Sequence, residues 1–440
     1  MKKAAKASKQ ISQETFDEVV KENLEDFDMS LEDATLDAVA QFESQGVDLS
    51  NIIKRVGRDD ANDDAARSAA EDLRRLESVI DALKTAPADA DSLVVEKLDA
   101  LAAMLDQTPE MKVVAGRHDA VDTVVALVGS PNDAIVEKAS ALLALLCTDN
   151  SDHQDFVGAA GLEQLAQALA TEWETRSTTT IARLLQAVRV VCSKHESNKS
   201  HFAKAKGVDT ACLYLERAAQ ATDDVLSKAV AAVLRVATIN DDPKATFSQA
   251  QDTIKLLVAK DLIAYILDVV QTHREQCDVL SAWLIVLKQL AITEEHCKKI
   301  YDLGGLDLLF QLMIQHERNL TVVKRCVTVF RNVAAADPIK EYIITSGGAE
   351  QIVAAMQTHR SDASMQQHAY VEELLRYAQP YRGCGDEAYA ALRDLGCDIK
   401  LSSFGTGTQP LAQFNPVNVE SNKLLDAVEE AAEAPFAQHA

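Results

Sequence analysis

Hydrophobic residues recur every three or four positions along most of the chain, which is the period of an amphipathic helix. The pattern comes in pairs of runs. A first run, such as LEQLAQAL, LDLLFQLM or AEQIVAAM, is followed by a polar break and then by a longer run, such as IARLLQAVRVVC, SAWLIVLKQLA or KRCVTVFRNVA. The sequence therefore predicts many helices joined by short polar turns.

These pairs of runs repeat along the chain. When they are aligned on the turn before the first run, the middle positions of that turn are Ala120, Gly161, Gly207, Asp261, Gly305 and Gly348. Successive positions are 41, 46, 54, 44 and 43 residues apart. A period of about 40–47 residues is typical of armadillo and HEAT repeats, whose units bury their apolar faces only against neighbours. We predict an all-α, armadillo/HEAT-like right-handed α-solenoid over residues 111–401.

One interval, of 54 residues, is longer than the others because it holds an extra stretch that begins at Asn240 and runs towards Asp252. Extra residues within one repeat usually form a loop on one face of a solenoid, and often on the binding face. Two interpretations stay open from the sequence: a loop that contributes to binding, and a surface insertion that the fold tolerates.

The segments on either side of the repeats follow other patterns. Residues 1–56 predict a helical N-terminal extension, and residues 57–110 predict a charged linker followed by capping helices. Residues 402–440 contain many Gly, Pro, Ser, Thr and Gln residues at their start, and they predict a flexible acidic tail.

The charged residues are unevenly distributed along the chain. The chain has 68 acidic and 44 basic side chains, a net charge of −24. Residues 1–110 carry −13 and residues 402–440 carry −4, which leaves −7 for the solenoid. Nucleic-acid binding depends on Lys and Arg at the phosphates, so the composition argues against a nucleic-acid partner.

The location of the protein is predicted from what the sequence does not contain. No apolar run approaches the roughly 20 residues of a membrane span, and the basic start has no apolar stretch of the secretory type. Eight cysteines occur without a CxxC pair, as expected for free thiols in a reducing compartment. We predict a cytoplasmic protein without membrane attachment, with the nucleus or a cilium as alternatives.

Motifs for catalysis are not found in the sequence, which has neither a GxxxxGK[ST] phosphate loop nor an HExxH metal motif. Cys192 and His195 lie on one helical face, but nothing in the sequence supplies a third group to orient the histidine. A buried structural cysteine beside a helix end is the favoured interpretation. We predict no enzyme, no cofactor, no metal site and no small-molecule substrate.

Two segments near opposite ends carry a closer resemblance to a known family. They are Gln13-Glu-Thr-Phe-Asp17, continued by the stretch from Gln41 to Ile52, and Ala390-Ala-Leu-Arg-Asp-Leu-Gly-Cys397. Together they resemble the armadillo repeat-containing protein 6 family, over roughly residues 9–401. The resemblance implies an intracellular armadillo protein without catalytic activity. Arg376 and Arg393 are only 17 residues apart, so part of the family's last repeats is missing here.

The last helix of each repeat lines the concave groove in armadillo folds, so its residues are candidates for partner binding. Alignment on Phe330-Arg-Asn-Val-Ala334 gives a first column of Ala144, Arg189, Arg235, Lys288, Arg331 and Arg376. The next column consists of Leu145, Val190, Val236, Gln289, Asn332 and Tyr377. The candidate groove residues are Arg189, Arg235, Lys288, Gln289, Arg331, Asn332, Arg376 and Tyr377.

These columns differ from those of nuclear import adaptors, which repeat an asparagine here with a tryptophan four residues earlier. In this chain Asn332 is preceded by Thr328 at the tryptophan position, and Gln289 is preceded by Ile285. A nuclear transport adaptor is therefore disfavoured. Trp283 aligns with core positions of the neighbouring repeats, and we expect it to pack in the core.

The basic column permits two interpretations. Five cations, one in each of five successive repeats, would form a stripe that docks an acidic or phosphorylated segment. Alternatively, each cation pairs with an acidic side chain of the neighbouring repeat and is structural. The sequence leaves both open.

The leading hypothesis from the sequence is a non-enzymatic scaffold that binds a segment of a protein partner in the concave groove. The alternative is a structural subunit of a larger cytoskeletal or ciliary assembly. A further hypothesis is that the acidic N-terminal segment lies over the basic column and competes with partners, because the charges are complementary. The sequence does not name the partner.

Overall fold

The computed structural model describes residues 9–365, apart from residues 12, 28–30, 46, 50–51, 53–62, 88, 109, 172, 221–223, 335 and 363–364. The chain divides into two compact units, which we call unit 1 (Met1–Lys260) and unit 2 (Asp261–Ala440). The predicted site residues Arg376 and Tyr377, and the predicted tail over 402–440, lie outside the described residues.

Unit 1 begins with a helix pair that has its own small core. The pair consists of α1 (Gln13–Phe27) and α2 (Leu31–Ser44), and two short strands, β1 (Lys9–Gln10) and β2 (Val47–Asp48), pair in parallel beside it. The Phe16 and Phe42 rings lie 6.0 Å apart in a core formed by Phe16, Val20, Ala34, Ala38, Phe42, Leu49 and Ile52. The described residues before α3 therefore contain a folded element.

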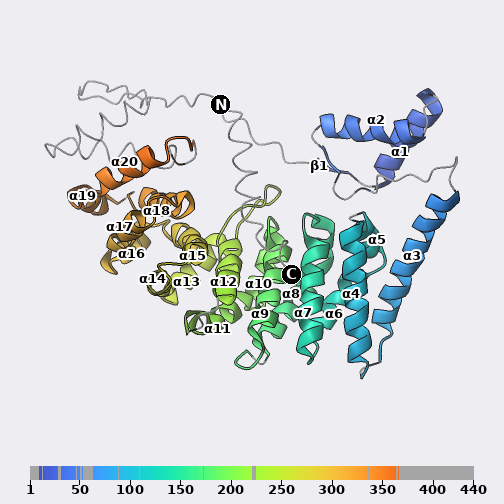
Figure 1. The fold of residues 1–440 in the computed structure, drawn as a ribbon, viewed down its shortest axis with the longest axis horizontal. Coiled ribbons are helices and arrows are strands. Elements are labelled where there is room, and N and C mark those ends of the chain that lie inside the picture. Colours follow the sequence, from blue (N-terminus) through green and yellow to red (C-terminus); the bar gives the residue numbers. More distant parts are fainter. Residues whose placement is uncertain are drawn as a thin grey trace. The chain divides into compact units, whose positions relative to one another are not determined.

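The rest of unit 1 is a stack of helices. Two helices lead into it, α3 (Asp63–Lys84) and α4 (Asp91–Gln107). Repeats follow, with helices α5 (Met111–Arg117), α6 (Ala120–Leu127), α7 (Asp133–Cys147), α8 (Ser151–Ala170), α9 (Thr178–Cys192), α10 (Glu196–Lys204), α11 (Gly207–Gln220), α12 (Asp224–Ala237) and α13 (Ala250–Ala259). Figure 1 shows α4, α7, α9 and α12 side by side, and each contacts the next.

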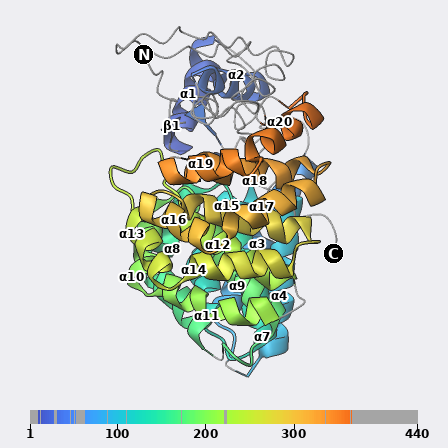
Figure 2. The same cartoon turned by 90° about the vertical axis from the view of Figure 1, so that its left-hand side faces the viewer.

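Unit 2 continues the same repeat. Its described helices are α14 (Leu262–Thr272), α15 (Cys277–Leu290), α16 (Glu294–Asp302), α17 (Gly305–Gln315), α18 (Leu320–Val333), α19 (Asp337–Thr345) and α20 (Gly348–Thr358). In Figure 2 the yellow and orange helices of this unit include α15 and α18, which pack against each other. The prediction of an all-helical solenoid is confirmed, and the two-residue strand pair of the N-terminal segment is the one described departure from it.

The repeat consists of a short first helix, a second helix and a last helix, as in α16, α17 and α18. A single residue in the left-handed region separates the first helix from the second, at Asp119, Lys206, Asp261, Gly304 and Gly347, with φ between 59° and 76°. Gly and Asp occupy four of these five positions, as expected for residues that tolerate positive φ. This turn therefore gives the repeat its regular spacing.

The second repeat corrects the alignment made from the sequence. The sequence pattern predicts the turn at Gly161, but the chain bends earlier, at Gly158, where φ is +49° and the helical course of α8 is interrupted. Gly161 lies inside the helix that follows, and a Cβ there would come within 2.7 Å of Val157 Cγ1. Gly161 is therefore needed for close packing, and the glycine with positive φ is Gly158, three residues earlier.

Three of the first helices bind the preceding repeat through the side chain of their third residue. His153 Nδ1 lies 2.8 Å from the carbonyl of Leu146, and His296 Nδ1 lies 2.9 Å from that of Leu290. Asn198 donates its side-chain amide to the Val191 carbonyl at 3.0 Å. The last carbonyls of a helix have no partner within that helix, so these side chains satisfy them and join successive repeats.

Trp283 lies in the core of unit 2, as expected from the alignment. Its side chain is fully buried, and its ring meets that of Tyr265 edge to face at 5.4 Å. The prediction that this tryptophan packs rather than binds a partner is confirmed.

Candidate partner-binding surface

The last helices of successive repeats lie next to one another in each unit. In unit 1, α9 contacts both α7 and α12, and in unit 2, α15 contacts α18. Because their buried positions face the other helices of the repeat, the remaining positions of each last helix lie on one side. We call this side the last-helix face of the unit.

The described cations of the first predicted column lie on this face. Arg189, Arg235 and Lys288 are half-buried on α9, α12 and α15, and Arg331 is exposed on α18, whereas Ala144 is buried on α7. Arg189 and Arg235 are brought together on neighbouring helices of unit 1, and Lys288 and Arg331 on neighbouring helices of unit 2. Within each unit, the repeat therefore places the predicted cations on neighbouring helices.

The second column contains both buried and half-buried residues. Leu145 is half-buried, whereas Val190 and Val236 are largely buried in unit 1. In unit 2, Gln289 and Asn332 are half-buried. The two positions that would hold tryptophans in an import adaptor, Ile285 and Thr328, are both buried, so neither side chain forms the wall of a surface slot.

Asn332 forms a hydrogen bond between two repeats of the solenoid. Its side-chain amide donates to the carbonyl of Lys288 at 3.0 Å, which joins α18 to the C-terminal end of α15. The Lys288 carbonyl belongs to the last turn of its helix and also accepts the N–H of the capping residue Ala291 at 3.3 Å. Asn332 therefore already has a structural task at the position where an adaptor's asparagine grips a peptide.

Replacing Asn332 with alanine is expected to lower the free energy of unfolding by about 1 kcal/mol, because it removes a largely shielded hydrogen bond. Partner capture by the full-length protein is expected to be unchanged. Urea denaturation followed by circular dichroism measures the first effect. A loss of partner capture without any loss of stability would assign Asn332 to binding instead.

Basic residues are concentrated on four of the last helices. Together α9, α12, α15 and α18 contain Arg183, Arg189, Lys228, Arg235, Lys288, Lys324, Arg325 and Arg331. Their acidic residues are Asp224 and Asp278, each in the first turn of its helix. We call these eight cations the basic face, which has one part in each unit. It carries a positive charge in a chain of net charge −24.

The basic face begins at α9. The two preceding last-helix elements have the opposite character: α4 contains four acidic residues and one lysine, and α7 contains two acidic residues and one lysine. Lys138 of α7 forms an ion pair with Asp99 of α4. The column seen in the sequence, which starts with Ala144, thus marks a change from an acidic to a basic last-helix face within unit 1.

The inserted loop of the third repeat is anchored by a buried charged cluster. Lys199 and Glu196 of α10 have side chains that are 2% and 1% exposed, and their charged atoms lie 3.6 Å apart. The Lys199 ammonium also donates to the Ile239 carbonyl at 2.8 Å and pairs with Asp241. Glu196 accepts a hydrogen bond from the backbone of Gln249. Both ends of the insertion are therefore held by α10.

Asp242 adds a third attachment for the loop. Its carboxylate accepts the backbone N–H groups of Glu196 at 2.9 Å and of Lys244 at 2.8 Å. Partial burial would raise the pKa of Asp242, but these hydrogen bonds and the nearby His195 hold it below the ordinary aspartate value. The sequence could not distinguish a binding loop from a tolerated insertion. The structure shows an insertion attached to the repeat before it.

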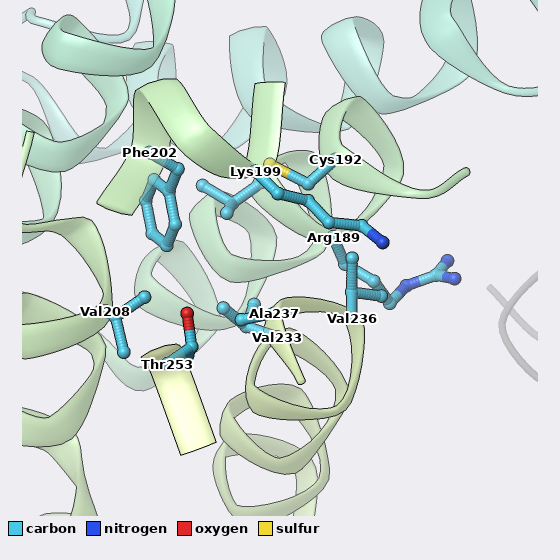
Figure 3. A pocket seen from close by; sticks show the side chains of 10 residues that line it. Arg189, Cys192, Lys199, Phe202, Val208, Val233, Val236, Ala237 and Thr253 are labelled. Carbon is cyan, nitrogen blue, oxygen red and sulfur yellow. The ribbon is translucent and has the colours of Figure 1, made fainter. Parts of the chain in front are cut away.

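A small hollow lies between α9, α10, α11, α12 and α13. Figure 3 shows Phe202, Val208 and Val233 among its apolar lining, and the cationic ends of Arg189 and Lys199 lie on the same side of it. The hollow has room for about one water-sized group. It is a packing gap beside the inserted loop and does not form a ligand pocket.

Cys192 and His195 have separate structural roles. Burial raises the pKa of Cys192 to about 12. His195 caps α10 by accepting the Asn198 N–H at Nδ1, 3.2 Å away, and its Nε2 lies 2.9 Å from Asp155. The interpretation of a buried structural cysteine beside a helix end is confirmed. In the described part of the chain, no three His, Cys, Asp or Glu side chains converge as metal ligands would, and no helix is long and apolar enough to cross a membrane.

Three-helix repeats with a left-handed residue between the first two helices, and last helices aligned side by side, define an armadillo-repeat protein. Comparisons with known proteins agree. Residues 8–71 match the Armadillo repeat-containing protein 6 N-terminal domain. Human Armadillo repeat-containing protein 6 is 30% identical over 368 residues, which cover 81% of this chain and 71% of the human one.

The chain belongs to the armadillo repeat-containing protein 6 family, as its sequence resemblance predicted. The Drosophila melanogaster homologue is 26% identical over 371 residues, covering 81% of this chain and 75% of that protein. Among solved structures, one from a study of the cadherin–β-catenin interaction and its phosphorylation switch has a TM-score of 0.50 and 13% identity, covering 72% of this chain and 63% of that one. At that identity it shows a shared fold.

Proposed function

We propose that this protein is a non-enzymatic interaction scaffold that binds an acidic or phosphorylated partner segment along its basic face. Membership of an armadillo family supports the general role, because such repeats build extended binding surfaces from side-by-side helices. The nature of the partner segment rests on one observation: eight cations and two acidic residues on α9, α12, α15 and α18, in a chain of net charge −24.

Arginine makes this face suited to carboxylates and phosphates. Its planar guanidinium offers parallel N–H donors that match two oxygens of such a group, and these charge-assisted bonds are stronger than neutral ones. Five of the eight cations are arginines, namely Arg183, Arg189, Arg235, Arg325 and Arg331. Within each unit, neighbouring last helices are expected to hold successive acidic groups of an extended segment, one or two per repeat.

A related fold offers a parallel for the type of partner. The solved structure compared above belongs to a study in which phosphorylation switches the interaction between cadherin and β-catenin. For this chain, the expectation that added phosphate charge strengthens binding to the basic face rests on charge complementarity alone. The identity of the partner is a separate question, which capture experiments address.

Affinity capture with three full-length baits tests the proposal: the wild type, R189E/R235E, and a matched control, K255E/K298E. Lys255 and Lys298 are on first helices with side chains 72% and 67% exposed, so the control makes the same charge change elsewhere. Quantitative mass spectrometry is expected to find proteins retained by the wild type and the control and lost with R189E/R235E. Equal capture by all three baits would contradict the proposal.

A further inference from the structure

Three histidines end the second helices of unit 2 at the same place in each repeat. His273, His316 and His359 follow the last residues of α14, α17 and α20. His316 Nε2 lies 2.7 Å from the carbonyl of Arg274, and His359 Nε2 lies 2.8 Å from that of Glu317. Each of these two rings is bound to the residue that follows the histidine of the preceding repeat, so the repeat itself fixes its orientation.

The repeat of α15 adds a cysteine to this arrangement. Cys277 is the first residue of α15, and its Sγ lies 3.6 Å from His316 Nδ1. A carbonyl oxygen can only accept, so the hydrogen bond to Arg274 requires the proton on Nε2 of the neutral ring. Nδ1 then carries the lone pair, directed at the thiol. A nucleophile, a base and a group that orients the base are thus present together, which is the arrangement of an activated thiol.

Both partners of the pair lie at helix ends. Cys277 is the first residue of α15, and His316 follows the last residue of α17. The charged side chains nearby in sequence are Arg274, Glu275 and Asp278 beside Cys277, and Glu317 and Arg318 beside His316. Arg274 and Glu275 both hydrogen-bond to Gln315.

The other described cysteines have no such arrangement. Burial raises the pKa of Cys212 to about 11 and that of Cys192 to about 12. It also raises the pKa values of Cys147, Cys297 and Cys326. These thiols stay protonated at neutral pH and react slowly, because the thiolate is the nucleophile. Cys212 is half-buried, as Cys277 is, so it offers a matched comparison.

We propose that Cys277 is a site of reversible mixed-disulfide formation with low-molecular-weight disulfides. His316 takes the thiol proton, and the Cys277 thiolate attacks one sulfur of the disulfide. A new S–S bond forms as the original one breaks, and the departing thiolate takes the proton back from His316. The bound group is removed by a thiol in the reverse exchange. This modification is independent of partner binding at the basic face.

Residue-resolved alkylation of the folded, full-length protein tests the proposal. With limiting iodoacetamide at pH 7, Cys277 is expected to react about tenfold or more faster than Cys212, and H316Q is expected to remove most of this advantage. Oxidised glutathione is expected to add one glutathione at Cys277, and dithiothreitol to remove it. The peptides are quantified separately by mass spectrometry, so the cysteines outside the described residues do not interfere.

The histidine of the next repeat supplies the control. H359Q alters the same type of carbonyl contact as H316Q but leaves the base beside Cys277 in place. It is expected to leave the alkylation rate of Cys277 unchanged. If H359Q and H316Q slow Cys277 equally, or if Cys212 reacts as fast as Cys277 in the wild type, the proposal is wrong.

Discussion

Replacing Lys199 with methionine is expected to destabilise the protein by about 3–5 kcal/mol, the cost of leaving a buried charge without its partner. The charge in question is the carboxylate of Glu196, whose side chain is 1% exposed. Its Oε2 atom has no hydrogen bond, and the Lys199 ammonium at 3.6 Å is its described counter-charge. Methionine preserves the length and apolar stem of lysine, so the loss reports charge rather than packing.

The same substitution is expected to release the inserted loop. Lys199 holds the Ile239 carbonyl and Asp241 at the start of the loop, and Glu196 holds the Gln249 amide at its end. In K199M, amide hydrogen exchange between residues 239 and 249 is therefore expected to accelerate more than exchange in α15 or α18. Urea denaturation measures the total loss of stability.

A double-mutant cycle separates this explanation from a general packing defect. The variant E196Q/K199M removes both charges, and its amide oxygen can still accept the Gln249 N–H. It is expected to recover most of the stability lost in K199M, because a neutral pair costs little to bury. A single variant within about 1 kcal/mol of the wild type, or a double variant no better than the single one, would contradict the account.

The loop attachment is also expected to depend on pH. The pKa of Asp242 is lowered in the folded protein, so its stabilising contribution is present at neutral pH. That contribution is lost as the pH falls from the ordinary aspartate range through the lowered pKa. Acid is therefore expected to loosen the loop, and D242N is expected to remove this part of the pH dependence.

Reversing two charges on the basic face, in R189E/R235E, is expected to weaken binding of the captured partner segment about 100-fold or more. Hydrogen bonds to charged groups contribute about 1.5–3 kcal/mol each, and two lost bonds convert to at least two orders of magnitude. Each glutamate also repels an acidic segment. Fluorescence anisotropy with the labelled segment measures the dissociation constant, and K255E/K298E is expected to bind as the wild type does.

Salt provides an independent check of the same interaction. Binding between exposed charges weakens as the Debye length shortens from about 10 Å at 0.1 M salt to about 3 Å at 1 M. The wild type is expected to lose affinity with salt, and R189E/R235E is expected to lose much less. Wild-type affinity that does not change with salt would indicate an apolar contact and would contradict the electrostatic explanation.

The repeat was predictable because two features of the sequence indicate it: the period of the apolar runs and the residues of the turns. Gly304 and Gly347 precede the aligned positions and adopt the positive φ that glycine permits. Gly158 was missed because Gly161, three residues later, fits the same pattern for a different reason: close packing against Val157. Composition does not distinguish a glycine needed for its φ from one needed for space.

The candidate surface was predictable in part. The spacing of Arg189 and Arg235 places them on neighbouring helices, as the structure shows. The task of Asn332 was not predictable, because its partner is a carbonyl 44 residues away. The burial of the Glu196–Lys199 pair was not predictable either, because a lysine and a glutamate three residues apart usually lie on a solvated helix face. Here the inserted loop covers them.

The pair formed by Cys277 and His316 shows where sequence reasoning could have gone further. Histidines 43 residues apart at positions 273, 316 and 359 are visible in the sequence. Cys192 and His195 are neighbours in the sequence, whereas a solenoid also brings together residues one repeat apart. Spacing by one period is therefore the relevant search in a repeat protein.

Hydrogen exchange of the full-length protein, with and without the captured partner segment, tests the central claim most directly. Binding along the basic face predicts new protection in α9, α12, α15 and α18, and little change in the second helices α11, α14 and α17. Protection confined to those second helices, or to α1 and α2, with none in the last helices, would contradict it.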